Sequence, residues 1–474
     1  MFLSFYSLPL FGYFDKLKVG VNLTAVFNRT DVHYIIKVMD KNIKKNNPVF
    51  LSIFASLLAI SIIFTDLPIF RSLPSLLTKS PMLFIAPVIF CLLLVMGGLK
   101  IELSEIGKYF FLYALITIIS GSVILIIYVI STGNIYSPFG DLLWIDLLKA
   151  ATHNIIFFLA YYSLFYTVKH LGKNKFDKYI FALLFIYLTA GIIEFFKPGS
   201  LNFLLFYQNG PRLQLLASEP SQSALVLTIL AGLALIKTKN LTAKILIMFL
   251  FLAIFPLILS KGAIIYLIAS LAIVYFFSAS KKLKIVLLPV ILAVAIAGII
   301  FTKKILPHFL FSEDFNTRIT CQIASLKSLF FYPFGEGYGT YRIFLPKLLL
   351  SSFNFLQGLI RIPLPHSEIT DMVKTGINLS AKSGIFQQFI LNGIFALMFF
   401  FIIFKRSFNF ISKSNETDIN KFIYKTLLLY ILFSLTGSVN MSVMYAYLLP
   451  IVLLEKDYVE TYKNNPRQVL CVSK

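Results

Sequence analysis

Long apolar runs recur along this chain and constrain its fold more than any other feature of the sequence. Each run has roughly the 20 apolar residues that an α-helix needs to cross the hydrocarbon core of a bilayer. We expect about 12 transmembrane helices, near 49–65, 81–98, 109–131, 150–168, 179–196, 221–237, 244–260, 262–280, 284–302, 383–404, 422–438 and 441–455. The sequence therefore predicts an all-α polytopic membrane protein.

The charged residues fit this class. Only 14% of the chain is charged, whereas soluble domains have about 25%. The net charge of +22 would suggest nucleic-acid binding in a soluble protein. Here the Lys and Arg residues lie in short turns between apolar runs, as the positive-inside rule predicts. We therefore expect no nucleic-acid partner.

The basic clusters assign sides to the connections, because cytoplasmic loops carry the excess of Lys and Arg. The short outside connections hold few cations, namely Arg71, Lys79, Lys197, Arg212 and Lys261. Both termini are then cytoplasmic. The chain divides into a basic N-terminal segment (1–48), helices 1–9 (49–302), one large extracytoplasmic loop (303–382), helices 10–12 (383–455) and a cytoplasmic tail (456–474).

The sequence shows no pattern for a metal, a disulfide framework or a cofactor. Cys91, Cys321 and Cys471 fall in a predicted span, in the large loop and in the tail, so neither a disulfide framework nor a CxxC site is expected. The loop also lacks HExxH, GxSxG and DxD-type motifs.

Two cations stand beside predicted helix starts on the outside. Arg212 precedes the helix that begins near Pro220, and a helix N-terminus with an arginine favours a phosphate or diphosphate. Alternatively, Arg212 contacts lipid headgroups and Glu219 pairs with it. Lys261 begins another helix, where it is either a second phosphate ligand or an anchor at the membrane edge.

Arg318 opens the polar part of the large loop. Ile319, Ile323 and Leu326 follow it at helical spacing, which predicts a short amphipathic helix against the membrane surface. The glycines of the later sequence GEGYG do not follow a strand, so a nucleotide-binding loop is excluded. A tight turn that lets the backbone approach a ligand or another helix fits better.

His366 lies in the densest polar cluster of the loop, with Glu368 nearby. A histidine can deprotonate a hydroxyl near neutral pH, although a loop histidine is more often simply hydrated. Beyond it, Ser383, Gln387 and Asn392 recur near helical spacing and predict a polar stripe facing the protein interior or a wet cavity.

The predicted topology places Arg212, Lys261, Arg318 and His366 on the same face of the membrane. Cationic and basic groups gathered there would suit an anionic substrate presented from the bilayer. A lipid-linked diphosphate is the natural candidate.

Five segments, in this order, resemble motifs of the O-antigen polymerase and O-antigen ligase family, which includes the Wzy-type repeat-unit polymerases. The segments are NGPRLQLLASEPSQSA, SKGAIIYLIASLAIV, RITCQIASLKSLFFYPFGEGYGTY, PHSEIT and SGIFQQFILNGIFALMFF. The first 200 residues resemble the family only in being hydrophobic.

The resemblance implies a metal-independent glycosyltransferase with a GT-C-like fold, which acts on undecaprenyl-diphosphate-linked glycans at the periplasmic face of the bacterial inner membrane. Arg212 and Arg318 would hold the donor diphosphate, with help from Lys261, and His366 would orient or deprotonate the acceptor hydroxyl. The family often has Arg at the position of Lys261, and lysine binds phosphate as a point charge rather than bidentately.

Other roles follow from the residues rather than from the resemblance. We expect Glu368 to be the partner of His366, and Glu219 and Gln387 to support the site. Expected partners are the lipid-linked glycan, membrane lipid, and a chain-length regulator and flippase of the same pathway.

Two alternatives to a polymerase stay open. A ligase of the same family would transfer the glycan to lipid A–core, and the two differ only in the acceptor. A flippase or transporter would place charges within its spans and would need no large outer loop.

Overall fold

The computed structural model describes most of the chain between residues 49 and 464. Outside this description lie 1–48, 65–79, 97–100, 102, 198–214, 217–218, 259, 279–284, 286–287, 290–311, 361–363, 438–443 and 465–474. The described part is helical, with one isolated β-bridge between Tyr136 and Leu142. Its helices are Val49–Ile63, α2 (Met82–Met96), α3 (Glu105–Thr132), α4 (Leu143–Leu171), α5 (Lys173–Phe196), α6 (Pro220–Lys237), α7 (Leu241–Ile254), η3 (Phe255–Ile258), α8 (Lys261–Ser278), α10 (Glu313–Phe331), α11 (Tyr341–Ile360), α12 (Ser367–Thr375), α13 (Gly384–Asn392), α14 (Ile394–Lys413), α15 (Asp418–Gly437) and α16 (Leu448–Asn464).

Eight of the described helices are long and apolar enough to cross a membrane. They are α3, α4, α5, α6, α7 with η3, α11, α14 and α15. Three shorter apolar helices coincide with further predicted runs, namely Val49–Ile63, α2 and α8. An all-α protein with several helices that could span a membrane is therefore confirmed, whereas the count of 12 is not. The run predicted at 284–302 lies almost entirely outside the described residues.

The predicted large loop is itself helical. Its described residues form α10, α11 and α12. By length and composition α11 could cross a membrane, so the placement of 303–382 as one extracytoplasmic loop stays a prediction. Likewise, α16 begins at Leu448 and runs to Asn464, so the first residues of the predicted cytoplasmic tail continue a helix.

The predicted span at 383–404 is broken. Helix α13 ends at Asn392, Gly393 adopts a positive φ of 54°, and α14 starts at Ile394. The sequence Asn-Gly within an apolar run is a common signal for a helix end. One predicted span is thus a nine-residue helix followed by a long one.

Residues 333–340, which we call the glycine-rich turn, follow α10 and pack into this break. The Ile394 amide donates to the Pro333 carbonyl at 2.7 Å, and the Glu336 amide donates to the Ile390 carbonyl at 2.7 Å. A Cβ atom on Gly393 would lie 2.1 Å from the Pro333 oxygen, so the two backbones can meet only at glycine. The prediction that this turn approaches another helix is confirmed.

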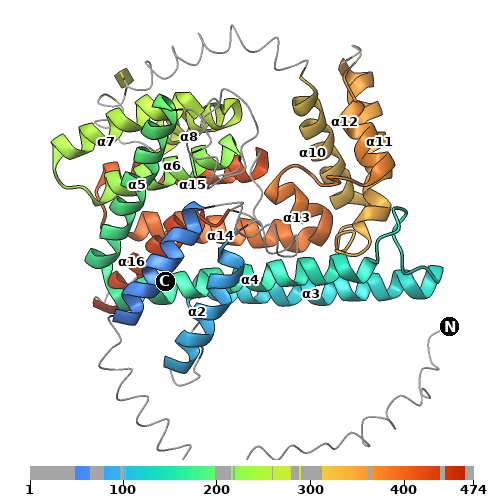
Figure 1. The fold of residues 1–474 in the computed structure, drawn as a ribbon, viewed down its shortest axis with the longest axis horizontal. Coiled ribbons are helices and arrows are strands. Elements are labelled where there is room, and N and C mark those ends of the chain that lie inside the picture. The colour runs from blue at the N-terminus through green and yellow to red at the C-terminus, as the bar shows by residue number, and fades with distance from the viewer. Residues whose placement is uncertain are drawn as a thin grey trace, which may run out of the picture.

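Helices α3 and α4 form a long pair that organises the molecule (Figure 1). Helices α2, α14 and α16 pack along this pair, while α5, α6, α7, α8 and α15 form a second group. Helices α10, α11 and α12 stand together near the far end of the pair. There Arg342 of α11 forms ion pairs with Asp141 and Asp146, which tie α11 to the α3–α4 connection.

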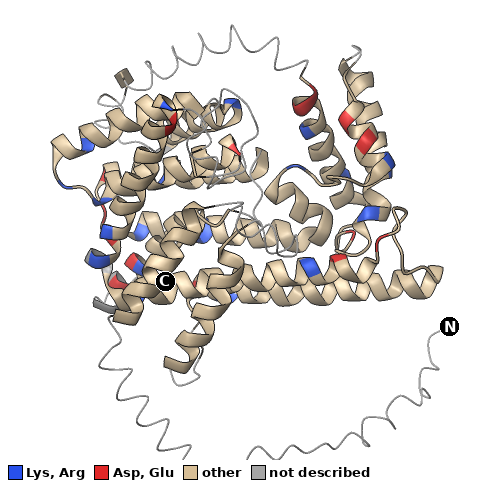
Figure 2. Ribbon diagram, viewed as in Figure 1, with Lys and Arg blue, Asp and Glu red and all other residues tan. Residues whose placement is uncertain are grey.

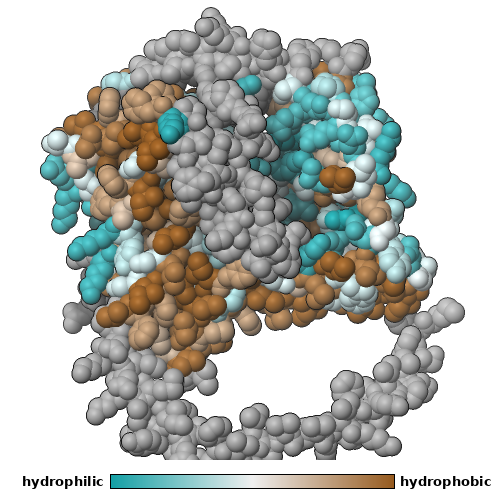
Figure 3. All heavy atoms as spheres, in the orientation of Figure 1, coloured by the Kyte–Doolittle hydropathy of each residue, from teal (hydrophilic) through white to brown (hydrophobic). Residues whose placement is uncertain are grey.

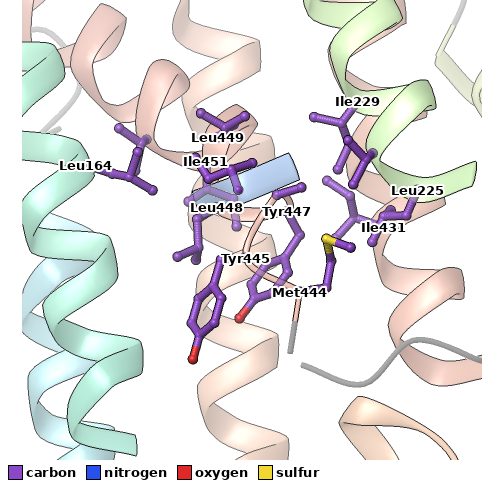
Figure 4. Packing of buried hydrophobic residues seen from close by; sticks show 14 of the residues in the cluster. Leu164, Leu225, Ile229, Ile431, Met444, Tyr445, Tyr447, Leu448, Leu449 and Ile451 are labelled. Atoms are coloured by element: carbon purple, nitrogen blue, oxygen red, sulfur yellow. The ribbon is translucent and has the colours of Figure 1, made fainter. Parts of the chain in front are cut away.

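Two apolar cores hold most of the buried residues, and the larger one spans both the α3–α4 group and the second group. The larger core includes the start of α16, whose Leu448 lies among residues of α4 and α6 such as Leu164 and Leu225 (Figure 4). The smaller core joins α10, α11, α12 and α13 through residues such as Leu349 and Ile369. The helices of the predicted loop therefore form a packed unit of their own.

Charges lie mainly at helix ends and on the α10–α12 unit (Figure 2). In the same view, hydrophilic surface covers α10–α12 and hydrophobic surface lies along α2, α3 and the α5–α7 side (Figure 3). The α10–α12 unit is therefore the hydrophilic part of the face seen in Figure 3.

Candidate functional site

Arg318 lies in the N-terminal half of α10, where three elements meet. Its Nε donates to Asp314 Oδ1 at 3.0 Å, and its Nη1 donates to the Lys382 carbonyl at 3.2 Å and to the Gly437 carbonyl at 3.5 Å. Gly437 ends α15. One guanidinium therefore joins α10, the turn before α13, and the end of α15.

The electrostatic environment of Arg318 reaches two more helices. Burial lowers the pKa of its guanidinium, but Asp314, Glu219 and Tyr266 outweigh this effect and keep the pKa above its usual value. Glu219 immediately precedes α6, and Tyr266 lies on α8. Arg318 is therefore a permanent cation close to the starts of both helices.

The apolar stripe predicted for α10 is not its buried face, and its placement against the membrane surface stays a prediction. Ile319 and Ile323 are only partly buried and Leu326 is exposed. The buried face consists of small residues, namely Asn316, Thr317, Thr320, Cys321, Ala324, Ser325 and Ser328. Small side chains let α10 approach α11 and α13 closely.

The turn at residues 380–383 is fixed from several sides. The Ala381 amide donates to Gln387 Oε1 at 2.6 Å, so Gln387 holds this turn, and its supporting role in a site stays a prediction. Ser383 Oγ donates to the Leu435 carbonyl at 2.9 Å. The thiol of Cys321 lies 3.5 Å from the Ser380 carbonyl. Helices α10, α13 and α15 together hold this turn.

Glu368 faces Lys382 rather than His366. The ammonium of Lys382 lies 2.8 Å from Glu368 Oε1. The sequence predicts Glu368 as the partner of His366, but the Glu368 carboxylate instead forms an ion pair with the positively charged Lys382. Lys382 lies just before a predicted span, and no local pattern singles it out.

Glu313 is the carboxylate that reaches the His366 region. It accepts hydrogen bonds from Ser367 Oγ and from the Glu368 amide, the latter at 2.6 Å. The Ser367 hydroxyl and then the Glu368 amide lower the pKa of Glu313, and His366 adds to the effect. Glu313 thus caps the first turn of α12, a role that sequence reasoning missed because α10 and α12 are far apart in the chain.

His366 is exposed at the residue before α12. Its Nδ1 lies 3.4 Å from the Leu364 carbonyl, and its ring centroid lies 5.4 Å from that of Phe353. The ring is accessible to an external hydroxyl, and its role as a base stays a prediction.

Of the other predicted site residues, Arg212 lies outside the described residues. Glu219 is the N-cap of α6, and Lys261 is the first residue of α8, so both stand at helix starts as predicted. Glu194 accepts a hydrogen bond from the Leu215 amide at 2.9 Å, which anchors the chain shortly after Arg212.

The predicted polar stripe extends into a buried network. Asn392 Nδ2 donates to the hydroxyls of Tyr113 and Tyr338 at 3.0 and 2.9 Å, and to Gln388 Oε1 at 2.8 Å. Asn154 of α4 also donates to Tyr338. The stripe faces the protein interior, as predicted, and it ties α13 to α3, α4 and the glycine-rich turn.

The described residues thus gather Arg318, Lys382, Glu368, Asp314 and Glu219 from four parts of the chain. Such a site can bind an anion through fixed cations. Within the described ranges, no three His, Cys, Asp or Glu side chains are grouped in a way that could hold a metal ion.

No protein-family model matches the chain, and no curated protein shows significant similarity to it. The functional assignment therefore depends on the contacts described above and on the resemblance of short motifs. Both centre on Arg318.

Proposed function

We propose that this protein polymerises oligosaccharide repeat units carried on undecaprenyl diphosphate, by glycosyl transfer at the periplasmic face of the bacterial inner membrane. The observation that carries the proposal is the setting of Arg318. The residues around it are Glu219, Tyr266, Lys382 and Gly437. Glu219 and Tyr266 lie within segments that resemble the family, and Lys382 immediately precedes another such segment.

The reaction is a displacement at the anomeric carbon of the donor glycan. The acceptor hydroxyl loses its proton to His366 and forms the new glycosidic bond, while the bond from the anomeric carbon to the diphosphate breaks. Negative charge then grows on the departing diphosphate. A cation fixed in advance stabilises this charge more in the transition state than in the ground state.

The test is polymerisation by the purified protein in lipid nanodiscs supplied with undecaprenyl-diphosphate-linked repeat units. Arg318→Ala should lower the rate about 100-fold or more, as removal of one preorganised donor does elsewhere. Lys327→Ala is the matched control, because Lys327 is a cation on the same helix that contacts only Ser351 and the Phe355 ring among the described residues. A fully active Arg318→Ala variant would refute this assignment.

The acceptor separates the proposal from its alternatives. Polymer formed without lipid A–core supports a polymerase, whereas transfer only to added lipid A–core identifies a ligase. Movement of the lipid-linked unit across the bilayer without a new glycosidic bond identifies a flippase. In cells we expect a chain-length regulator and a flippase of the same pathway to act with the polymerase.

A further inference from the structure

Lys382 has an unusual backbone conformation. Its φ is +54°, and among the described residues only Leu215 and Asn378 share a positive φ without being glycine. A long side chain is disfavoured in this conformation, and glycine would adopt it freely. Residues in this conformation persist only where the surrounding structure imposes it, and they are found most often at functional sites.

The surroundings of Lys382 do impose it. Gln387 and Ser383 hold the flanking backbone, as described above, and the Lys382 carbonyl accepts from Arg318. The ammonium is therefore presented from a fixed turn, and the backbone of the same residue orients the guanidinium. Both cations are therefore held by the same turn.

The counter-ions of this pair are more accessible than the cations. The side chains of Lys382 and Arg318 are 22% and 29% exposed, whereas those of their partners Glu368 and Asp314 are 34% and 70% exposed. Fixed cations with outward carboxylates form a site where an incoming anion can replace the carboxylates. Two positive charges held by one turn match the two phosphoryl groups of a diphosphate.

We propose that Lys382 and Arg318 together bind a diphosphate, and that Glu368 and Asp314 are resting counter-ions which the diphosphate displaces. This assignment rests on the proposed function, since it names Lys382 as a further ligand of the same leaving group. Glu368 is then a competitor of the substrate rather than a catalytic base.

The test measures the affinity of inorganic diphosphate and of farnesyl diphosphate for the full-length protein in nanodiscs, by calorimetry. Lys382→Gly keeps the positive φ and removes the ammonium, so affinity should fall about tenfold or more while the thermal midpoint stays equal or rises. Glu368→Gln should bind several-fold more tightly. Asn378→Gly is the matched control, because it relieves the same backbone conformation at φ +56° without removing a charge, and it should bind like wild type.

The outcomes separate the sources of the anion. If Lys382→Gly binds both compounds, or farnesyl diphosphate alone, more weakly than wild type does, the ligand is a lipid-borne diphosphate. If Lys382→Gly binds only inorganic diphosphate more weakly, the site exists but its ligand is a soluble anion. Unchanged affinity of Lys382→Gly for both compounds overturns the proposal. So does a lower affinity that is accompanied by a lower thermal midpoint and by unchanged binding in Glu368→Gln.

The two proposals fail independently. If diphosphate binding depends on Lys382 but the protein forms no polymer, the diphosphate site is supported and the polymerase function is refuted. If Lys382→Gly polymerises at the wild-type rate, the polymerase function is supported and the role of Lys382 in it is refuted.

Discussion

Glu313 lies 54 residues before Ser367, yet its carboxylate holds the start of α12. The first amides of a helix have no partner within the helix, and a carboxylate that accepts from them is stabilising. Since His366 is the residue before this turn, the position of the predicted base depends on a carboxylate from another helix.

Glu313→Gln should therefore destabilise the α12 start by about 1 kcal/mol, the usual cost of losing a cap. The folded-state pKa of Glu313 lies below its unfolded value. Its contribution is therefore present above the unfolded pKa and is lost as pH falls through the folded pKa. Thermal unfolding at pH 7 should separate wild type from the variant, and the difference should disappear in acid. Asp371→Asn, on the exposed side of α12, should show no such difference.

The pKa of Glu336 is shifted in the opposite direction to that of Glu313. It is 1% exposed, and the nearby Ser328 hydroxyl only partly offsets the cost of burying its charge. Burial raises its pKa to about 8 from 4.5. The folded protein therefore keeps this proton over a pH range in which the unfolded chain has lost it.

Stability should consequently fall as pH rises from about 4.5 to about 8, by roughly 5 kcal/mol at most, and level off above that range. Glu336→Gln should abolish this slope, because an amide does not ionise. Thermal midpoints of both proteins from pH 5 to pH 9 provide the measurement. Parallel curves would show that Glu336 is ionised in the folded state.

At the scale of elements, the central feature is the junction between the glycine-rich turn and the break between α13 and α14. The turn supplies the carbonyl of Pro333 to the first amide of α14, and α13 supplies carbonyls to the turn. Helix ends in an apolar environment need such partners, since no water replaces them. The broken helix and the turn therefore stabilise each other.

Gly393→Ala should disrupt this junction, because the added Cβ would meet backbone atoms of the turn at 2.1 to 2.6 Å. We expect a loss of about 3 kcal/mol or more, or failure to fold. Gly358→Ala on α11 is the control, since nothing lies within 4 Å of its Cβ position and alanine favours a helix. Equal thermal midpoints for the two variants would contradict the close contact.

At the scale of the whole molecule, hydropathy predicted which segments are helical but not how each lies in the fold. Helices α6 and α7 both read as spans, yet 78% of the α6 window is buried inside the protein against 22% for α7. Apolar composition cannot distinguish protein from lipid as the surrounding medium. The sequence also predicts a loop over α11, although the composition of α11 permits a span.

The site shows a similar limit. Arg318 and the helix starts at Glu219 and Lys261 could be found from local patterns, because helix starts and lone cations are local features. The Lys382–Glu368 and Glu313–Ser367 contacts join distant segments and have no local signature. The break at Gly393 did have one, in the Asn-Gly pair within the apolar run.

The Arg318–Asp314 and Lys382–Glu368 ion pairs also affect the rate at which an anion associates with the site. Because Asp314 and Glu368 balance the two cations, a polyanion diffusing toward the resting site meets little net field. Its capture would gain little from long-range attraction and would change little with ionic strength. A lipid-borne ligand has little need of such attraction, since the membrane already confines its search to two dimensions.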